Sequence, residues 1–182
     1  MADSTLTFRH ATRNDTEILL PLIHSAYRGE ERTGWTTEAD LVGGDRIDAS
    51  GLVEKIEAPD SVILVVTDKQ DALVACCEIL WRADQEAGYF GLFAVDPKRQ
   101  GGGVGRQVLA YAEEYARQQW AACKMEMCVI WLREEIIAYY QRRGYRKTGE
   151  QRPFPHEYIA RFNGKAFRND LYFEVLVKDL AA

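Results

Sequence analysis

The chain has 182 residues, 47% hydrophobic and 28% charged, which favours one folded domain over residues 1–182 and disfavours wholesale disorder. Its 23 Lys and Arg against 28 Asp and Glu give a formal net charge of −5, which disfavours nucleic acid and an anionic membrane as partners. The N-terminus lacks a basic start before a long apolar stretch, and no apolar run approaches the roughly 18 residues of a spanning helix. We therefore expect a cytoplasmic protein with no nucleic-acid or membrane partner.

The first third of the chain predicts a strand, a helix and a long polar connection. Residues 6–11 read as a short strand. Apolar side chains at helical spacing predict a helix over Asp15–Tyr27, with Asn14 as its N-cap. The polar connection 28–60 contains a short helix over Leu52–Ile56, and connections of this length often carry function.

The middle of the chain predicts a meander followed by a crossover. Three strand-like runs, 61–68, 72–82 and 87–96, are joined by short turns, which indicates antiparallel neighbours. A helix over Gly103–Gln119 then leads to a strand over 124–132. A strand, a helix and a second strand form a crossover unit, so strands 87–96 and 124–132 should be parallel.

The last third predicts a helix over 133–144, which ends at Gly144 in a left-handed cap. Two strands follow, 145–153 and 171–180, separated by an aromatic loop. Together the elements predict an α/β (α+β) fold with a central mixed, mostly antiparallel twisted sheet of about seven strands, flanked by helices on both faces.

The four cysteines do not form a metal-binding pattern. Cys76, Cys77, Cys123 and Cys128 contain no C-x-x-C pair, and no histidine lies near them in sequence, so we expect no metal. Cys76 and Cys77 are adjacent in a strand, so their side chains should point to opposite faces of the sheet.

A glycine cluster stands directly before the helix that begins near residue 103. It comprises Gly101, Gly102, Gly103 and Gly105. Backbone N–H groups at a helix N-terminus bind phosphate, and glycine lets the anion approach. The P-loop pattern fails because no Lys-Ser or Lys-Thr follows, and the G-x-G-x-x-G dinucleotide register fails because its sixth position is Arg106 or Val108.

The register that fits is Q-x-x-G-x-G, from Gln100 to Gly105. The segment VDPKRQGGGVGRQVL resembles the acetyl-CoA pyrophosphate signature of the GNAT N-acetyltransferase superfamily. A second segment, IIAYYQRRGY, resembles a downstream motif of the same family, with Tyr140, Gly144 and Tyr145 at the matching positions. The resemblance implies the GNAT fold and an acyl-CoA-dependent N-acyltransferase that uses acetyl-CoA as co-substrate.

The resemblance also implies where the coenzyme binds. The strand before the glycines should be splayed from its neighbour, so that its backbone pairs with the pantetheine arm and polarises the thioester carbonyl. Lys98 and Arg99 are candidates for the outer phosphate. Arg133 replaces an asparagine that many relatives carry. The expected coenzyme-binding residues are Phe93, Ala94, Val95, Gln100, Gly101, Gly102, Gly103, Val104, Gly105, Arg106 and Arg133.

Tyr140 is the candidate general acid for the departing thiolate, although its ring can also serve only for packing. A general base is harder to assign, because an alkyl ammonium has a pKa of about 10.4 and must lose a proton before it attacks. Glu78 and Glu38 are candidates, and a water-mediated route is equally open.

In this family the segment after the first helix and the loop between the last two strands frame the acceptor. Glu38 and Glu78 suit a cationic amine, whereas Arg46 suits a carboxylate, so we expect an amino acid-like or polyamine-like primary amine. The candidate pocket residues are Trp35, Thr37, Glu38 and Arg46 on one side, and Phe154, His156 and Tyr158 on the other.

Three alternatives stay open at this point. The fold could serve as a non-catalytic acyl-CoA-binding module, or the acceptor could be the N-terminus of a peptide or protein. A dinucleotide-binding oxidoreductase is disfavoured by the failed glycine register. The family resemblance also allows a homodimer.

Overall fold

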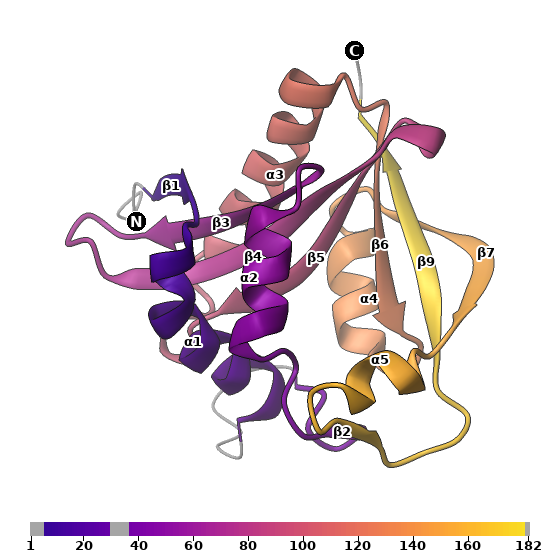
Figure 1. Cartoon of the computed structure of the whole chain (residues 1–182). Coiled ribbons are helices and arrows are strands. Elements are labelled where there is room, and N and C mark those ends of the chain that lie inside the picture. The colour runs from indigo at the N-terminus through magenta and orange to yellow at the C-terminus, as the bar shows by residue number, and fades with distance from the viewer. Residues whose placement is uncertain (1–5, 30–36, 181–182) are drawn as a thin grey trace.

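The computed structural model describes residues 6–29 and 37–180. A seven-stranded sheet with the strand order β1-β3-β4-β5-β6-β9-β7 forms its centre (Figure 1). All neighbouring strands in it are antiparallel except β5 and β6, which are parallel as predicted. The strands are β1 (Thr7–His10), β3 (Ser61–Thr67), β4 (Leu73–Arg82), β5 (Ala87–Val95), β6 (Lys124–Ile130), β7 (Arg146–Pro153) and β9 (Tyr172–Asp179).

Helices cover both faces of this sheet, as the sequence predicts (Figure 1). One face carries α1 and α2, and the other carries α3 and α4. In the described ranges, no helix combines the length and the apolar character needed to cross a membrane. The helices are α1 (Thr16–Arg28), α2 (Ala49–Glu57), α3 (Val104–Trp120), α4 (Glu134–Gln141) and α5 (His156–Ala160).

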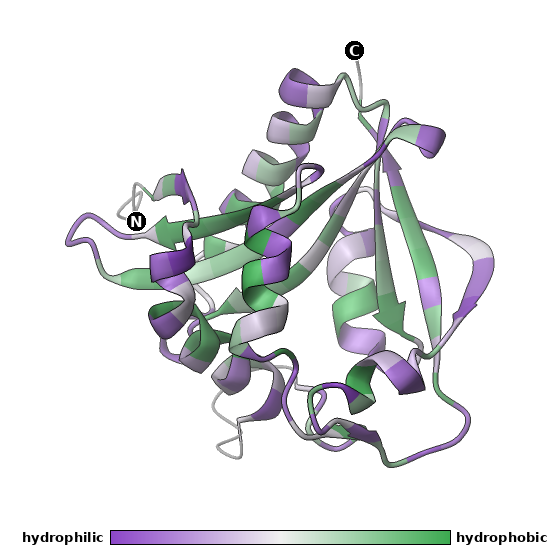
Figure 2. Cartoon of the chain, viewed as in Figure 1, coloured by the Kyte–Doolittle hydropathy of each residue, from purple (hydrophilic) through white to green (hydrophobic). Residues whose placement is uncertain are grey.

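The sheet separates two hydrophobic cores, and adjacent cysteines mark the division. Cys76 packs in the core under α1 and α2 with Leu92, whereas Cys77 packs in the core under α3 with Phe90. Their predicted opposite orientation is confirmed. Strands β3, β4 and β6 are largely hydrophobic and the helices show polar outer faces, whereas the edge strand β7 is polar and exposed (Figure 2). The sheet is therefore buried on both sides at its centre but not at this edge.

Local sequence rules missed three details. Asn14 does not cap α1; instead Thr12 and Asp15 form a capping box one turn earlier. The second helix is longer than predicted, because the Asp48 side chain accepts a hydrogen bond from the Gly51 N–H and starts the helix three residues earlier. The aromatic loop contains the one-turn helix α5 and a two-residue ladder between β2 (Val42–Gly43) and β8 (Lys165–Ala166).

The parallel pair β5 and β6 separates soon after it begins. Its register runs only from Ala87 with Lys124 to Tyr89 with Glu126. Beyond that point the β6-facing edge of β5 has no strand partner in the described residues. A bulge in the β4–β5 pairing lies opposite, with Leu92 at a φ of 44°. The predicted splay is therefore present, and it opens the sheet where the glycine turn follows.

Candidate active site

A cavity of about 830 Å³ lies where β5 and β6 diverge. Both strands line it, β5 through Tyr89–Phe93 and Val95, and β6 through Met127–Ile130. The glycine turn, α4, α1 and α5 supply the remaining walls. Ala94 is directed away from the cavity, into the core under α1 and α2, so only its backbone is available for the role that the sequence predicts.

The glycine turn opens onto this cavity. Gly101 and Gly103 have φ values of 87° and 80°, and a Cβ on either would meet no atom within 4 Å. Gly103 is the N-cap of α3, so the first free N–H groups of that 17-residue helix follow it directly. Gly102 has an ordinary φ and does not line the cavity. The turn has the geometry of an anion site, and Gly102 contributes least to it.

Three arginines near the glycine turn line the cavity, and only one of them was among the phosphate-binding candidates from the sequence. Arg106 lines the cavity, together with Arg142 and Arg143, which directly follow α4. Arg99 instead pairs with Asp68 at 2.9 Å, and Lys98 is exposed outside the cavity. The sequence signal for Arg142 and Arg143 is their position directly before Gly144, in the same motif as Tyr140.

Arg143 is held in place by its neighbour on α4. Its guanidinium carbon lies 3.3 Å from the centroid of the Tyr139 ring, and its Nη1 donates to the Tyr139 carbonyl at 2.8 Å. Its Nε is buried without a hydrogen-bond partner. A stacked guanidinium with an unsatisfied donor at the cavity wall is suited to a phosphate.

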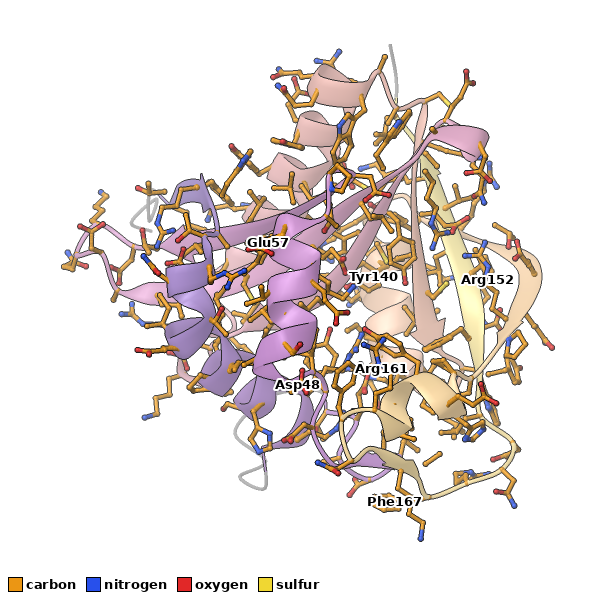
Figure 3. All side chains as sticks on the ribbon, in the orientation of Figure 1. Asp48, Glu57, Tyr140, Arg152, Arg161 and Phe167 are labelled. Carbon is orange, nitrogen blue, oxygen red and sulfur yellow. The ribbon has the colours of Figure 1, made fainter. Side chains whose placement is uncertain are left out.

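Tyr140 lies near the middle of the molecule and lines the cavity (Figure 3). Its side chain is buried, with its ring edge-on to Tyr139 and Tyr145. Its hydroxyl makes no hydrogen bond within the part of the chain that the structure describes. Burial raises the pKa of Tyr140, so the phenol stays protonated at neutral pH and is available as a donor.

Glu78 does not line the cavity. The Lys55 Nζ donates to both of its carboxylate oxygens, at 2.7 and 2.8 Å, and the Ser61 hydroxyl lies 3.3 Å from one of them. The carboxylate is thus engaged between α2 and the sheet. This position does not support the predicted role of Glu78 as general base.

Glu38 does line the cavity, but two arginines hold it. Arg28 Nη1 lies 2.8 Å from one carboxylate oxygen and Arg133 Nη1 lies 3.0 Å from the other. Burial works against the charged form, yet the two guanidinium groups leave the pKa of Glu38 below its usual value. A carboxylate in this state is a poor proton acceptor. Arg133 lines the cavity and directs its Nη1 to Glu38, and its coenzyme contact stays a prediction.

The predicted acceptor residues fall into three groups. Arg46, Phe154 and Tyr158 line the cavity. Thr37 and His156 are described but do not line it, and Trp35 lies outside the described residues. Tyr27 and Arg28, at the end of α1, line the cavity and were missed by sequence reasoning, although both stand where the first helix meets the long connection.

The segment that carries much of this site matches a known protein family. The model of the acetyltransferase (GNAT) domain family matches residues 59–147, a segment that includes the splayed strand, the glycine turn and Tyr140. This segment of the chain matches the GNAT acetyltransferase family, which is the family that the sequence resembles. The predicted family is therefore confirmed, and no curated protein matches the chain.

Solved GNAT structures have the same fold. The spermidine N-acetyltransferase SpeG from Vibrio cholerae, in complex with CoA and spermine, superposes with a TM-score of 0.69 at 17% identity, over 96% of this chain and 95% of that one. A chimera of the Vibrio cholerae enzyme and hSSAT gives a TM-score of 0.68 at 18% identity, over 97% and 96%. At this identity the similarity confirms the predicted GNAT fold.

Proposed function

We propose that this GNAT protein transfers the acetyl group of acetyl-CoA to a primary amine of a small molecule, amino acid-like or polyamine-like. Transfer occurs by direct attack in a ternary complex. The observation that carries the proposal is the single cavity that joins the splayed β5 edge, the glycine turn and Tyr140. The similarity in fold to an acetyltransferase structure that contains CoA and spermine supports the same class of reaction.

The described residues fit the coenzyme. The pyrophosphate would bind the N–H groups at the start of α3, where Gly101 and Gly103 leave the approach open. Arg106, Arg142 and Arg143 would balance the phosphate charges. The pantetheine arm would extend along the unpartnered edge of β5, whose backbone groups can form the hydrogen bonds that a strand neighbour would otherwise make.

The chemistry follows from these positions. The neutral amine nitrogen attacks the thioester carbonyl carbon, and backbone N–H groups of Phe93–Val95 stabilise the oxyanion. As the tetrahedral intermediate collapses, the carbon–sulfur bond breaks and Tyr140 donates its proton to the leaving thiolate. Because Glu78 is outside the cavity and Glu38 is held by two arginines, the amine loses its proton to water.

Thermal denaturation tests the coenzyme assignment. Acetyl-CoA should raise the melting temperature, whereas NAD and ATP should not, because a ligand that binds only the native state stabilises it. The absence of a shift with saturating acetyl-CoA would contradict the proposal.

Thiol release from acetyl-CoA in the presence of amino acids, polyamines and peptide N-termini tests turnover. A thermal shift without thiol release for any amine would favour the non-catalytic alternative. The single-domain organisation over residues 1–182, a homodimer and a cytoplasmic location stay predictions from the sequence.

A further inference from the structure

The acceptor side of the cavity contains a guanidinium group that forms no ion pair or hydrogen bond with the described residues. Arg46 lines the cavity between β2 and α2. Among the described residues it forms no hydrogen bond or ion pair, and its guanidinium carbon lies 5.3 Å from the centroid of the Tyr27 ring. A charged group in a partly buried position is costly unless something pairs with it. Within residues 6–29 and 37–180, Glu38 is the carboxylate that acts on Arg46, and it forms no ion pair with it. The position of Arg46 at the cavity wall therefore suits a further anion.

The cavity wall carries an excess of positive charge, which also favours an anionic ligand. Its described lining contains six arginines, one carboxylate, and no lysine, aspartate or histidine. This is the reverse of the whole chain, whose formal net charge is −5. The arginines are Arg28, Arg46, Arg106, Arg133, Arg142 and Arg143.

These arginines divide into two sets of three. Arg106, Arg142 and Arg143 lie around Tyr139, next to the glycine turn, and influence its pKa together. In the proposed function, these three arginines bind the phosphates of the coenzyme. The other set lies on the acceptor side, where Arg28 and Arg133 already bind the two oxygens of Glu38. One carboxylate against three guanidinium groups leaves an excess of positive charge there.

We propose that the acceptor is an amine that also bears a carboxylate, such as a free amino acid, and that Arg46 binds this carboxylate. The inference rests on the proposed acetyltransferase function and narrows its substrate class. A polyamine would place a second ammonium group among the arginines and gain no described carboxylate beyond Glu38. A carboxylate instead matches the planar fork of Arg46 with two parallel hydrogen bonds.

Neighbouring phenols complete the subsite. Tyr27 and Tyr158 line the cavity and influence Arg46 electrostatically, and neither hydroxyl bonds to another group in the described part of the chain. Both can donate to the same anion. Tyr27 and Tyr140 line the same cavity, so the carboxylate subsite and the proposed acid face one bound acceptor.

Matched acceptors test the proposal on the unmodified protein. Initial rates of thiol release are measured with common amino acids, with the same amino acids as carboxamides, and with putrescine and spermidine. The amino acids should exceed their carboxamides in kcat/KM by on the order of 10- to 100-fold, the range expected for a charge-assisted hydrogen bond. If putrescine, spermidine or the carboxamides are the better acceptors, the function stands and the carboxylate subsite is refuted.

Variants then test the role of Arg46. Arg46→Gln should raise KM for the amino acid and abolish its advantage over the carboxamide, with KM for acetyl-CoA unchanged, and Arg46→Lys should restore part of that advantage. Arg168→Gln is the control, because Arg168 pairs with Asp170 on the surface outside the cavity. An equal loss with acid and carboxamide would show that Arg46 is only structural.

A binding experiment separates this inference from the proposed function. If no amine is acetylated, the acetyltransferase function fails, and the melting temperature is measured with CoA and each amino acid. A further rise with amino acids but not with carboxamides, lost in Arg46→Gln, would still support the subsite. No rise with any amino acid would overturn it.

Discussion

The hydroxyl oxygen of Tyr139 lies 2.6 Å from the position that a Cβ atom would take on Gly105. Gly105 is in the first turn of α3, and Tyr139 is in α4. The close approach therefore joins the glycine turn to the helix that carries Tyr140 and directly precedes the two cavity arginines. Glycine is needed at position 105 for this close approach, and not for its backbone dihedral angles.

Gly105→Ala should weaken coenzyme binding. A Cβ at 2.6 Å from the Tyr139 oxygen is closer than real Cβ contacts occur, so either α3 or Tyr139 must move, and Tyr139 carries Arg143 on its ring. We expect KM for acetyl-CoA to rise on the order of tenfold, comparable to the loss of one charge-assisted hydrogen bond. Steady-state kinetics at saturating acceptor measure it.

Gly102→Ala is the matched control, because its nearest atom would be the Arg99 carbonyl oxygen at 3.9 Å. It should change KM by no more than about twofold. In a Tyr139→Phe background the penalty of Gly105→Ala should shrink, since the colliding oxygen is gone. A penalty of the same size in both backgrounds would rule out the steric explanation.

Most residues predicted for the coenzyme line one cavity, whereas the residues predicted for the acceptor do so only in part. The glycine register and the tyrosine motif are local patterns whose chemistry depends on neighbours in the chain, and the structure brings both to one cavity. The environment of Glu38 instead depends on Arg28, ten residues away, and on Arg133, 95 residues away. Neither periodicity nor motif spacing predicts an ion pair between residues so far apart in sequence. The two arginine partners of Glu38 therefore could not be predicted.

Tyr140→Phe should lower kcat by roughly 100-fold or more, the range for loss of a positioned general acid. KM for acetyl-CoA should change little, because the phosphate-binding groups are elsewhere. Stability should also be preserved, since the Tyr140 hydroxyl has no hydrogen-bond partner in the described residues to lose. Kinetics and thermal denaturation of the same preparation measure both quantities.

Tyr145→Phe is the comparison for Tyr140→Phe. The Tyr145 hydroxyl bonds to the Glu113 carboxylate at 2.9 Å and lies outside the cavity. Its removal should cost about 1 kcal/mol in the free energy of unfolding and leave kcat unchanged. If Tyr140→Phe keeps full kcat, the tyrosine serves only for packing.

The pH dependence should report the acceptor amine and no side-chain base. The two arginines hold the pKa of Glu38 below its usual value, and burial raises that of Tyr140, so neither titrates between about pH 6 and 9. For the acceptor, kcat/KM should then rise roughly tenfold per pH unit as the ammonium group loses its proton. If kcat/KM instead rose to a plateau with its half-maximum near neutral pH, a side-chain base with a raised pKa would be indicated.

Glu78→Gln should separate stability from catalysis. Its carboxylate binds Lys55 and does not reach the cavity, so kcat should stay at the wild-type value. The free energy of unfolding should fall by about 1–2 kcal/mol, because a partly buried ammonium group loses its charged partner. A large fall in kcat at unchanged stability would restore Glu78 as the base.

Asp15→Ala should destabilise the start of α1 in a pH-dependent way. Asp15 accepts from the Thr12 N–H at 2.7 Å and from Arg9 Nη2 at 2.6 Å, so its loss should cost about 1–2 kcal/mol at neutral pH. Its hydrogen bonds to Arg9 lower the pKa of Asp15 in the folded state. A lowered folded pKa means that the stabilisation is complete above the unfolded value of about 4 and is lost as the pH falls through the folded value.

Urea unfolding of the wild type and of Asp15→Ala between pH 7 and pH 3 measures this difference in stability. The gap between the two proteins should be constant down to about pH 5 and should narrow at lower pH. Asp84→Ala, at an exposed aspartate with no hydrogen bond to a described residue, should show no such gap. If the gap between wild type and Asp15→Ala stays constant to pH 3, the Arg9 pair contributes nothing and Asp15 acts through packing alone.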